Sequence, residues 1–350
     1  MTPKVSICIP AYNRPAEIVL LLESIASQPI GNWDVVICED RSPRGPEIEK
    51  AVKEFSGRHP KLVIHYSAND RNLGYDGNLR QLLDIATGEY CVFMGDDDVL
   101  VPGALARILG AIERPGTGFI LRAWRSVDKD TGDATEEHRY FPGDRLFPPN
   151  VESVAALFRR SVFISGLTIH RETARRFHTD RFDGLLLYQL YLVGRIVSEQ
   201  NGYYISDIIS VRHVGGEHFF GSGEKEEGRF TPGQLLPSQS VTFVRGLFEI
   251  ARTLDSECAP GLYSLVCKDL GRYSYPMLEI QARGLPRREF RAYAKELACL
   301  GLGDNWMFWA YYVALLSAGS RICNFMIRSV KRIWGRTPNL TGNQGIAVRQ

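Results

Sequence analysis

The sequence predicts an α/β protein with a mixed, mostly parallel sheet flanked by helices. Within the first 120 residues, short β-rich runs alternate with helical patterns, which is typical of parallel strands joined by crossover helices. The strand-like runs are β-branched or aromatic and bounded by turn residues: 5–9, 33–38, 62–66 and 90–94. Between them, apolar residues recur at helical spacing in 15–27, 46–55 and 77–86.

The pattern is less regular after residue 120, where it predicts a strand at 121–127 and a long polar loop over 129–150. The remaining predicted elements are helices at 151–160, 171–177 and 188–197, and one or two strands within 202–213. From about residue 236 to 335 only helical patterns occur. We therefore expect a first region over 1–235 and a second, helical region over 236–350.

The composition is that of an ordinary globular protein, with 44% hydrophobic and 23% charged residues in a chain of 350. Seven cysteines are scattered without a C-x-x-C pair, and three lie in strand-like runs, which favours buried thiols in a reducing compartment. The N-terminus has no signal-peptide pattern. We expect a cytoplasmic protein with no nucleic-acid partner.

The C-terminal end of the chain is basic. Six basic and no acidic residues follow Asp304, although the whole chain carries a net charge of only +2. The longest uncharged, mostly apolar run is 306–320, and its 15 residues are fewer than the ~20 that span a bilayer as a helix. Aromatic residues followed by basic ones make 306–336 suitable for lying on an anionic membrane, and a packing module with a solvated basic face is the alternative.

Polar residues follow each of the first four predicted strands. The motifs are PAYNR (10–14), EDRS (39–42), NDRNLG (69–74) and GDDD (95–98). Ligands of open parallel sheets bind outside the carboxyl ends of the strands, so these motifs are expected to meet on one rim. PAYNR contains no glycine, which disfavours a nicotinamide or flavin enzyme and a Walker-type phosphate loop.

Two residues of this rim suit a nucleotide. Asp40 has the chemistry to accept hydrogen bonds from a nucleobase imide or a ribose hydroxyl, and Tyr12 to cover the base. The alternative for Asp40 is a solvated turn and helix cap, and Asn72 with Gly74 is also compatible with ordinary turn chemistry. Their position beside the other strand ends favours the binding role.

The triplet Asp96–Asp98 predicts a site for Mg²⁺ or Mn²⁺, completed by water and substrate phosphates. The alternative is the acidic N-terminus of a helix over 99–112, where aspartate is favoured by the helix dipole. A cap needs only one aspartate, so three at the end of a strand favour a cation bound to a diphosphate.

In combination, the segments CIPAYNR, ICEDRSP and NDRNLGYDGNLRQLLDIATGEYCVFMGDDDVL resemble the nucleotide-sugar-binding half of the family 2 glycosyltransferases, which have the GT-A fold. The resemblance covers about residues 3–115 and extends more weakly to 215. GDDD, FDGLLLYQLYLVGRI and the basic helical tail look most like bacterial O-antigen deoxysugar transferases of the abequosyltransferase type. The resemblance implies a catalytic domain over 1–235, in which 1–115 binds the nucleotide sugar and 116–235 faces the acceptor.

The resemblance also implies roles for single residues. The residues implied to contact the nucleotide are Pro10, Ala11, Tyr12, Asn13 and Asp40, with Asn72 and the residues up to Asn78, Gly74 among them, near the ribose and diphosphate. Asp96 and Asp98 correspond to the D-x-D pair, with Asp98 as the direct metal ligand, and Asp97 is expected to face the nucleotide or to shape the turn. His213 or His218 is the candidate that completes the metal site.

One stretch of the chain departs from the family pattern. Many family 2 enzymes carry a Glu-Asp pair whose aspartate is the general base, and the corresponding region reads DRFDGLLLYQ over 180–189. Asp183 is the preferred base, with a loop or cap role as its alternative. Asp180, Glu199 and Glu217 are further candidates.

The resulting expectation is an inverting, metal-dependent transferase that moves a sugar from a nucleotide-diphosphate donor to a glycan or lipid-linked acceptor in bacterial surface polysaccharide synthesis. Such a protein would act in the cytoplasm or on the cytoplasmic face of the inner membrane. A nucleotidyltransferase is disfavoured because its Gly-rich, basic first loop is missing. A degenerate GT-A domain that acts as a sugar-binding module or scaffold is the second reading, because the Glu-Asp pair is absent.

Overall fold

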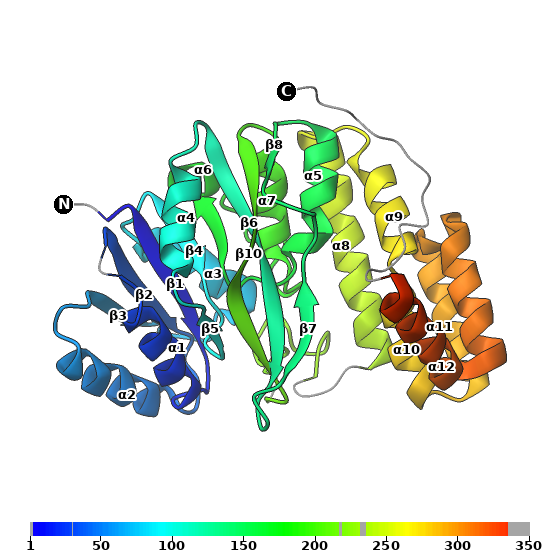
Figure 1. Ribbon diagram of the computed structural model, residues 1–350, viewed down its shortest axis with the longest axis horizontal. Coiled ribbons are helices and arrows are strands. Elements are labelled where there is room, and N and C mark those ends of the chain that lie inside the picture. Colours follow the sequence, from blue (N-terminus) through cyan, green and yellow to red (C-terminus); the bar gives the residue numbers. More distant parts are fainter. Residues whose placement is uncertain (1–2, 30, 217–218, 232–235, 335–350) are drawn as a thin grey trace. The chain divides into compact units, whose positions relative to one another are not determined.

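The computed structural model describes residues 3–29, 31–216, 219–231 and 236–334 (Figure 1). The chain divides into two compact units, Met1–Val266 and Cys267–Gln350, which are described separately. The predicted division after residue 235 stays a prediction about function. The compact first unit extends beyond residue 235, because it also contains the long helix Pro237–Glu257 and ends at Val266.

A mixed ten-stranded sheet forms the centre of the first unit. Its strands are β1 (Val5–Ala11), β2 (Trp33–Glu39), β3 (Ile64–Ala68), β4 (Tyr90–Phe93), β5 (Asp98–Leu100), β6 (Thr117–Asp128), β7 (Ala134–His138), β8 (Arg145–Phe147), β9 (Leu167–His170) and β10 (Asn201–Val214). The order is β3-β2-β1-β4-β9-β6-β10-β5, with β7 beside β6 and β8 beside β10. The first four strands in this order are parallel, as are β6 and β10, whereas β9 and β5 run antiparallel to their neighbours.

Helices cover both faces of this sheet (Figure 1). The helices of the first unit are α1 (Glu17–Ala26), α2 (Gly45–Arg58), α3 (Gly74–Ile85), α4 (Ala104–Ile112), α5 (Val151–Phe158), the 3-10 helix η1 (Arg159–Ser161), α6 (Arg171–Arg175), α7 (Tyr188–Val197) and α8 (Pro237–Glu257), the last of which packs on α7. Successive strand side chains point to opposite faces, so Ile7 and Ile9 share one apolar cluster with α1, α2 and α4, while α3 packs on β1 and β2 outside that cluster. The predicted α/β fold is confirmed.

Three local predictions were wrong. The helix expected over 99–112 begins only at Ala104, because Asp98–Leu100 pairs with β10 as strand β5 and Pro102-Gly103 separates the two elements. The acidic triplet is therefore not the N-terminus of a helix. The expected loop over 129–150 contains β7 and β8, and β9 has no counterpart among the predicted strands.

The pairing of β10 with β5 matters for the site. In this antiparallel pair Arg212 lies opposite Asp98, and in the parallel pair of β10 with β6 it lies opposite Ser126. Residues more than 100 positions apart in sequence therefore meet beside the GDDD motif.

The second unit is helical, as predicted. It contains α10 (Tyr275–Gly284), α11 (Arg287–Leu300), the 3-10 helix η2 (Leu302–Asp304) and α12 (Trp306–Trp334), and α9 (Leu262–Arg272) crosses the boundary between the units. α12 is kinked at Gly319, whose φ is 76°. Among the helices of the described residues, none is both long and apolar enough to cross a membrane.

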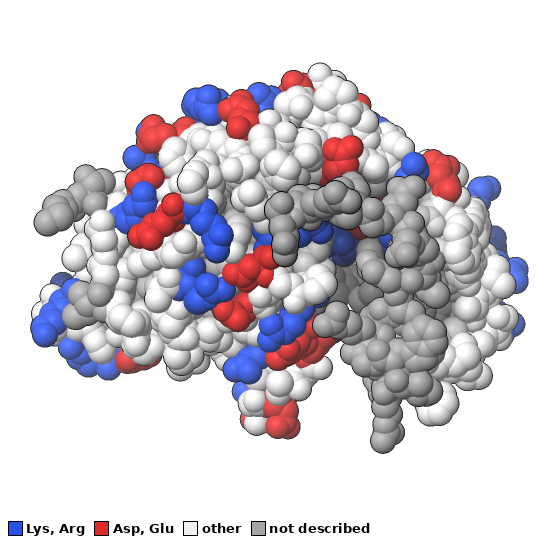
Figure 2. All heavy atoms as spheres, turned by 45° about the horizontal axis from the view of Figure 1, so that its top comes forward, with Lys and Arg blue, Asp and Glu red and all other residues white. Residues whose placement is uncertain are grey.

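Charged side chains of both signs are interspersed over the face drawn in Figure 2. Charged side chains of the first unit form exposed ion pairs, such as Arg107 with Asp144 and Asp207. Exposed pairs of this kind contribute only about 0–1 kcal/mol each. The fold is therefore held by its apolar layers rather than by surface charge.

Candidate active site

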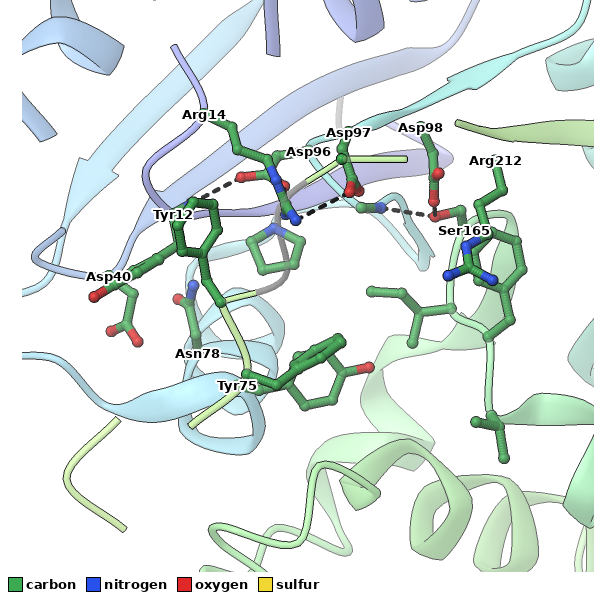
Figure 3. A pocket seen from close by; sticks show the side chains of 18 of the residues that line it. Tyr12, Arg14, Asp40, Tyr75, Asn78, Asp96, Asp97, Asp98, Ser165 and Arg212 are labelled. Carbon is green, nitrogen blue, oxygen red and sulfur yellow. Dashed lines mark hydrogen bonds and ion pairs between the residues drawn. The ribbon is translucent and has the colours of Figure 1, made fainter. Parts of the chain in front are cut away.

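A cavity of about 480 Å³ opens where β1, β2 and β4 end (Figure 3). This size is ordinary for a ligand pocket. Most of the predicted site residues line it: Pro10, Tyr12, Asp40, Asn72, Gly74, Asn78, Asp96, Asp97, Asp98 and His213. Ala11, Asn13 and Asp183 are not part of the lining.

We distinguish two halves of this cavity. The near half is formed by Tyr12, Asp40, Asn72, Tyr75 and Asn78, from the ends of β1 and β2 and from the start of α3. The far half is formed by Trp124, Tyr140, Arg159, Arg160, Phe163 and Arg212. Figure 3 shows Asp40 and Arg212 at opposite ends, with the aspartate triplet between them.

The backbone turns sharply after β1 and β2. Asn13 and Arg41 have left-handed φ values of 60° and 53°, a conformation that costs most residues other than glycine free energy. The Asn13 side-chain oxygen accepts a hydrogen bond from the backbone N–H of Arg44 at 3.1 Å, so this residue joins the two turns instead of lining the cavity. Two neighbouring strand ends are thereby fixed to each other.

Asp40 is held in place by a buried amide network. Its Oδ1 accepts hydrogen bonds from the Asn69 side chain and the Leu73 backbone, both at 2.8 Å. Asn69 also donates to Asn78, which in turn donates to the Cys38 carbonyl at 3.0 Å and so ties α3 to β2. Burial raises the pKa of Asp40 to about 6 in spite of these hydrogen bonds. Because both hydrogen bonds use Oδ1, the second oxygen, Oδ2, is the one suited to accept from a ligand.

Asp96 is fully engaged by the end of β1. Its two oxygens accept hydrogen bonds from the Tyr12 backbone and from Arg14, each at 2.8 Å. Arg14 also pairs with Asp97 at 3.1 Å, so one guanidinium bridges two carboxylates of the triplet. Burial raises the pKa of Asp96 to about 7 although the charge of Arg14 opposes that shift.

Asp98 differs from Asp96 because one of its oxygens has no partner. The Ser165 hydroxyl donates to Oδ2 and accepts a hydrogen bond from the Gly95 N–H at 2.9 Å. Oδ1 is buried, and no described residue donates a hydrogen bond to it. Burial and the neighbouring charge of Asp97 raise the pKa of Asp98 to about 8. The environment of this carboxylate favours the arrival of a positive charge.

These residues fit a divalent cation that is completed by its ligand. Among the described residues, no three His, Cys, Asp or Glu side chains form a ready-made metal cluster. Mg²⁺ and Mn²⁺ bound with diphosphates need only one or two protein carboxylates, and the unpartnered Oδ1 of Asp98 is a hard oxygen of that kind. His213 lines the same cavity and places Nδ1 3.1 Å from the Asp97 carbonyl, so that Nδ1 is the donor and Nε2 is the ring nitrogen suited to a metal. His218 lies outside the described residues.

A capping segment, residues 219–230, lies over the near half. Phe219 contacts Tyr12 with 5.8 Å between ring centroids and lies 5.1 Å from the Arg14 guanidinium carbon. The buried Glu226 accepts hydrogen bonds from the backbone N–H groups of Tyr75 at 2.6 Å and Gly221 at 2.8 Å. One carboxylate thus joins the N-terminus of α3 to the capping segment.

Gly74 is required at this junction. Its φ is 74°, and a Cβ atom there would lie 2.8 Å from Oε1 of Glu226. The Asn72 side chain accepts from Gly74 at 2.9 Å and donates to the Ser222 carbonyl at 3.2 Å. The N-x-G motif therefore anchors the capping segment in addition to lining the cavity.

Asp183 is engaged in ion pairs outside the cavity. Its carboxylate accepts two hydrogen bonds from Arg80, at 2.7 and 2.8 Å, and one from Lys225 at 2.7 Å. Burial alone would raise the pKa of Asp183, but the hydrogen bonds from Arg80 and Lys225 outweigh it and lower the pKa. In this arrangement Asp183 links α3 to the capping segment and is a weak base. Of the other candidates, Glu199 pairs with Arg176, and Glu217 lies outside the described residues.

Several lining residues were not predicted from the sequence, among them Ser165, Arg212 and Glu226, whereas Arg14 and Tyr75 lie within the predicted segments 10–14 and 72–78 without a role of their own. Arg14 directly follows the PAYN motif, and its charge opposite an acidic triplet was a usable signal. Ser165, Arg212 and Glu226 reach the site only through tertiary structure, so local sequence gave no indication of them.

The sequence matches known glycosyltransferases. The family model described as "Glycosyl transferase family 2" matches residues 6–170. Abequosyltransferase RfbV of Salmonella typhimurium is 34% identical over 102 residues, 29% of this chain and 30% of that relative. The amylovoran biosynthesis glycosyltransferase AmsB of Erwinia amylovora is 32% identical over 129 residues, 36% of this chain and 42% of that relative. The chain covers less than half of the length of these curated relatives.

Two solved structures share the fold over most of both chains. TarS 1–349 of S. aureus in complex with UDP-GlcNAc has a TM-score of 0.58 at 14% identity, with 95% of this chain and 92% of that chain covered. The mannosyltransferase PcManGT from Pyrobaculum calidifontis, in complex with GDP-Man and Mn²⁺, has a TM-score of 0.53 at 18% identity, with 96% and 88% covered. The fold is thus GT-A, and over residues 6–170 the chain is similar to glycosyltransferase family 2.

Proposed function

We propose that this protein is an inverting, metal-dependent glycosyltransferase that moves a sugar from a nucleotide-diphosphate donor to a glycan acceptor in bacterial surface polysaccharide synthesis. One observation carries the proposal: Tyr12, Asp40 and Asp98, from three different strand ends, line one cavity, and the buried Oδ1 of Asp98 has no donor among the described residues. The names of the relatives, an abequosyltransferase and an amylovoran biosynthesis enzyme, support a role in polysaccharide synthesis.

In this proposal the near half binds the nucleotide. Asp40 accepts a hydrogen bond from the base or ribose, and Tyr12, which is backed by Phe219, covers the base. The neighbours of known structure that were solved with UDP-GlcNAc and GDP-Man support a nucleotide-sugar donor. The capping segment closes this half and excludes water from the diphosphate.

Asp98 and His213 would hold the divalent cation, and Asp96 with Arg14 would keep the triplet in position. The cation, when bound, supplies Lewis-acid stabilisation of the leaving diphosphate. Ser165 orients Asp98 through its hydroxyl, which donates to Oδ2 and leaves the buried Oδ1 without a donor among the described residues. The Mn²⁺ present with PcManGT supports this assignment.

A single displacement needs a group that stabilises the leaving diphosphate and a base that removes the proton of the acceptor hydroxyl. Inversion at the anomeric carbon, which such a displacement produces, is inferred from the family resemblance. Asp183 stays a prediction for the role of base, and its ion pairs with Arg80 and Lys225 weigh against it.

We also propose that α12 contacts an anionic membrane that carries a lipid-linked acceptor. Large apolar side chains are exposed along this helix, including Trp306 at 70% and Phe325 at 72%. Such side chains suit the interface between headgroups and acyl chains. Flotation with vesicles of phosphatidylglycerol should carry the protein upward, and loss of flotation in a Trp306→Ser/Phe325→Ser variant would support the contact. Equal flotation of the variant would remove it.

The main test is a thermal-shift panel of nucleoside diphosphates with and without Mn²⁺. We expect at least one nucleotide to stabilise the wild type only with Mn²⁺, and Asp98→Ala to abolish that shift. Asp133→Ala, which replaces an exposed loop aspartate, is the matched control and should respond like the wild type. A wild type that no nucleotide stabilises in a metal-dependent way would refute the donor site.

A second measurement separates an enzyme from a sugar-binding scaffold. Slow, Mn²⁺-dependent hydrolysis of the nucleotide sugar, in the absence of acceptor, is expected of an enzyme because water replaces the acceptor hydroxyl. A protein that binds the donor tightly and hydrolyses none of it would be a scaffold.

A further inference from the structure

The far half of the cavity is not needed for the nucleotide. Its lining residues include side chains from β6, η1, β10 and the segment that leads into β9, whereas the nucleotide-binding motifs follow the ends of β1, β2 and β4. Any ligand there lies beyond Asp98 when seen from Asp40 (Figure 3). A second substrate that approaches the sugar of the donor would occupy this position.

The charge of the lining separates the two halves. The described carboxylates that line the cavity, Asp40, the aspartate triplet and Glu226, belong to the near half or to the boundary. The described residues of the far half contribute Arg159, Arg160 and Arg212 and no carboxylate. The fourth lining arginine, Arg14, already pairs with two members of the triplet.

Arg212 is the residue on which the inference rests. It lies opposite Asp98 in the β5–β10 pair, and its guanidinium points into the cavity (Figure 3). Its side chain forms no hydrogen bond or ion pair with the residues that the structure describes. A partly buried guanidinium has five donors and no acceptor, and it is best satisfied by a carboxylate or phosphate bound in bidentate geometry.

A fixed aromatic wall adjoins these arginines. The Trp124 indole N–H donates to the Tyr140 hydroxyl at 2.9 Å, and its ring stacks on His138 with centroids 3.7 Å apart. Phe163 contacts Trp124 at 4.2 Å and lies 4.9 Å from the guanidinium carbon of the buried Arg122. These contacts hold the wall in one conformation, which lowers the entropy lost when a ligand packs against it.

We infer that the far half is an acceptor subsite for a sugar that carries a negative charge, either the carboxylate of a uronic acid or a phosphate. The apolar face of the sugar ring packs on Phe163 and Tyr140, and the anionic group pairs with Arg212. A neutral sugar offers hydroxyl groups that both donate and accept, and the Arg212 guanidinium provides donors only. The inference rests on the proposed function, because it assigns the other half of the cavity to the donor.

The test compares probes that differ in charge. Isothermal titration uses the full chain with Mn²⁺ and the nucleoside diphosphate selected by the thermal-shift panel, and adds methyl β-D-glucuronide, glucose 6-phosphate or methyl β-D-glucoside. We expect at least one anionic probe to bind 10-fold or more tightly than the glucoside. Preference for the glucuronide indicates a carboxylate acceptor, and preference for the phosphate indicates a phosphorylated one.

Two variants locate the preference. Arg212→Gln should remove it, and Arg125→Gln, which replaces an exposed arginine on the neighbouring strand β6, should retain it. Arg212→Lys keeps the charge without the bidentate geometry and serves if the Gln variant does not fold; it should reduce the preference. Equal binding of all three probes, or an undiminished preference in these Arg212 variants, would overturn the inference.

The diphosphate of the donor is the other anion that could pair with Arg212. If Arg212→Gln weakens binding of the nucleoside diphosphate and the probes do not differ, Arg212 serves the donor diphosphate and the acceptor inference is wrong. If the protein binds the nucleotide but binds charged and neutral sugars equally, only this inference is refuted. If the protein binds no nucleotide, the proposed function itself is refuted.

Discussion

The near and far halves of the cavity are built from different chemistry. The near half presents carboxylates and amides that are buried and held by backbone hydrogen bonds, as in the Asp40 network. The far half presents guanidinium groups and aromatic rings on elements that are far apart in sequence. The difference indicates that the near half is preorganised for the nucleotide of the donor, and that the far half selects among acceptor sugars by their charge.

The largest expected effect falls on the boundary between the halves. Asp98→Asn replaces the unpartnered Oδ1 by an NH2 group, which does not bind a cation, while the amide oxygen still accepts the Ser165 hydrogen bond. We expect Mn²⁺ affinity in the presence of nucleotide to fall at least about 100-fold. Electron paramagnetic resonance of free Mn²⁺ measures this affinity directly.

The unfolding free energy is the control for this variant. It should change by less than about 1 kcal/mol, since the shape of the side chain is kept. Unchanged Mn²⁺ affinity in a well-folded Asp98→Asn protein would move the cation to other residues of the triplet and would erase the distinction between Asp96 and Asp98.

The second prediction concerns the link between α3 and the capping segment. Asp183→Asn leaves Arg80 and Lys225 without their carboxylate, and Arg80 is largely buried, with 21% of its side chain exposed. We expect the unfolding free energy to fall by about 2 kcal/mol, less than for a fully buried pair because Lys225 is 52% exposed. Urea denaturation measures the loss.

Asp180→Asn, three residues away, is the matched control and should be near neutral, because Asp180 forms no ion pair with the residues that the structure describes. If Asp183→Asn keeps full stability and donor binding while sugar transfer is lost, the carboxylate is the general base after all. The ion pairs of Asp183 with Arg80 and Lys225 would then belong to the protein without acceptor and would have to break before transfer.

The third prediction uses the raised pKa of Asp40, about 6. The folded protein holds this proton to a higher pH than the unfolded chain, so ionisation costs stability as pH rises from about 4 to 6. Ligand binding shows the opposite trend, because Oδ1 is already engaged and a proton on Oδ2 turns the remaining oxygen from an acceptor into a donor. Affinity for the nucleotide sugar should rise about 10-fold from pH 5 to 7, as the ionised fraction does.

A nucleotide sugar is the suitable ligand for this titration, since its diphosphate is esterified at both ends and does not titrate in that range. Asp40→Asn should bind more weakly at pH 7 and lose the part of the pH dependence that Asp40 causes. The same pH profile in wild type and variant would remove Asp40 from the binding site.

The two halves also differ in how well the sequence predicts them. The near half could be predicted because each motif follows a strand directly, and parallel strands bring their carboxyl ends to one rim. The meeting of PAYN, Asp40, N-x-G and GDDD on that rim therefore follows from the order of strands and motifs along the chain. Ala11 and Asn13 do not line the cavity, because successive residues of a strand point to opposite sides, and Asn13 instead joins two turns; their contact with the nucleotide stays a prediction.

The far half could not be predicted in the same way. Arg212 reaches Asp98 only because β10 returns antiparallel to β5, a three-residue strand hidden in what looked like the start of a helix. Ser165 lies before β9, which is four residues long and was not predicted. Short strands in irregular connections carry little periodicity, so the register that builds this half is set by tertiary packing.

The smallest expected effect tests how firmly the capping segment joins the near half. Glu226→Gln keeps the volume of the side chain and one acceptor oxygen but removes the charge that accepts hydrogen bonds from Tyr75 and Gly221. Charged hydrogen bonds exceed neutral ones by about 1 kcal/mol, which corresponds to a roughly 5-fold weaker affinity for the nucleotide sugar if the cap closes on it. Glu227→Gln, the exposed neighbour, should bind like the wild type. Tighter binding by Glu226→Gln would mean that the carboxylate repels the donor diphosphate more than it orders the cap, and the near half would then be held closed against its ligand.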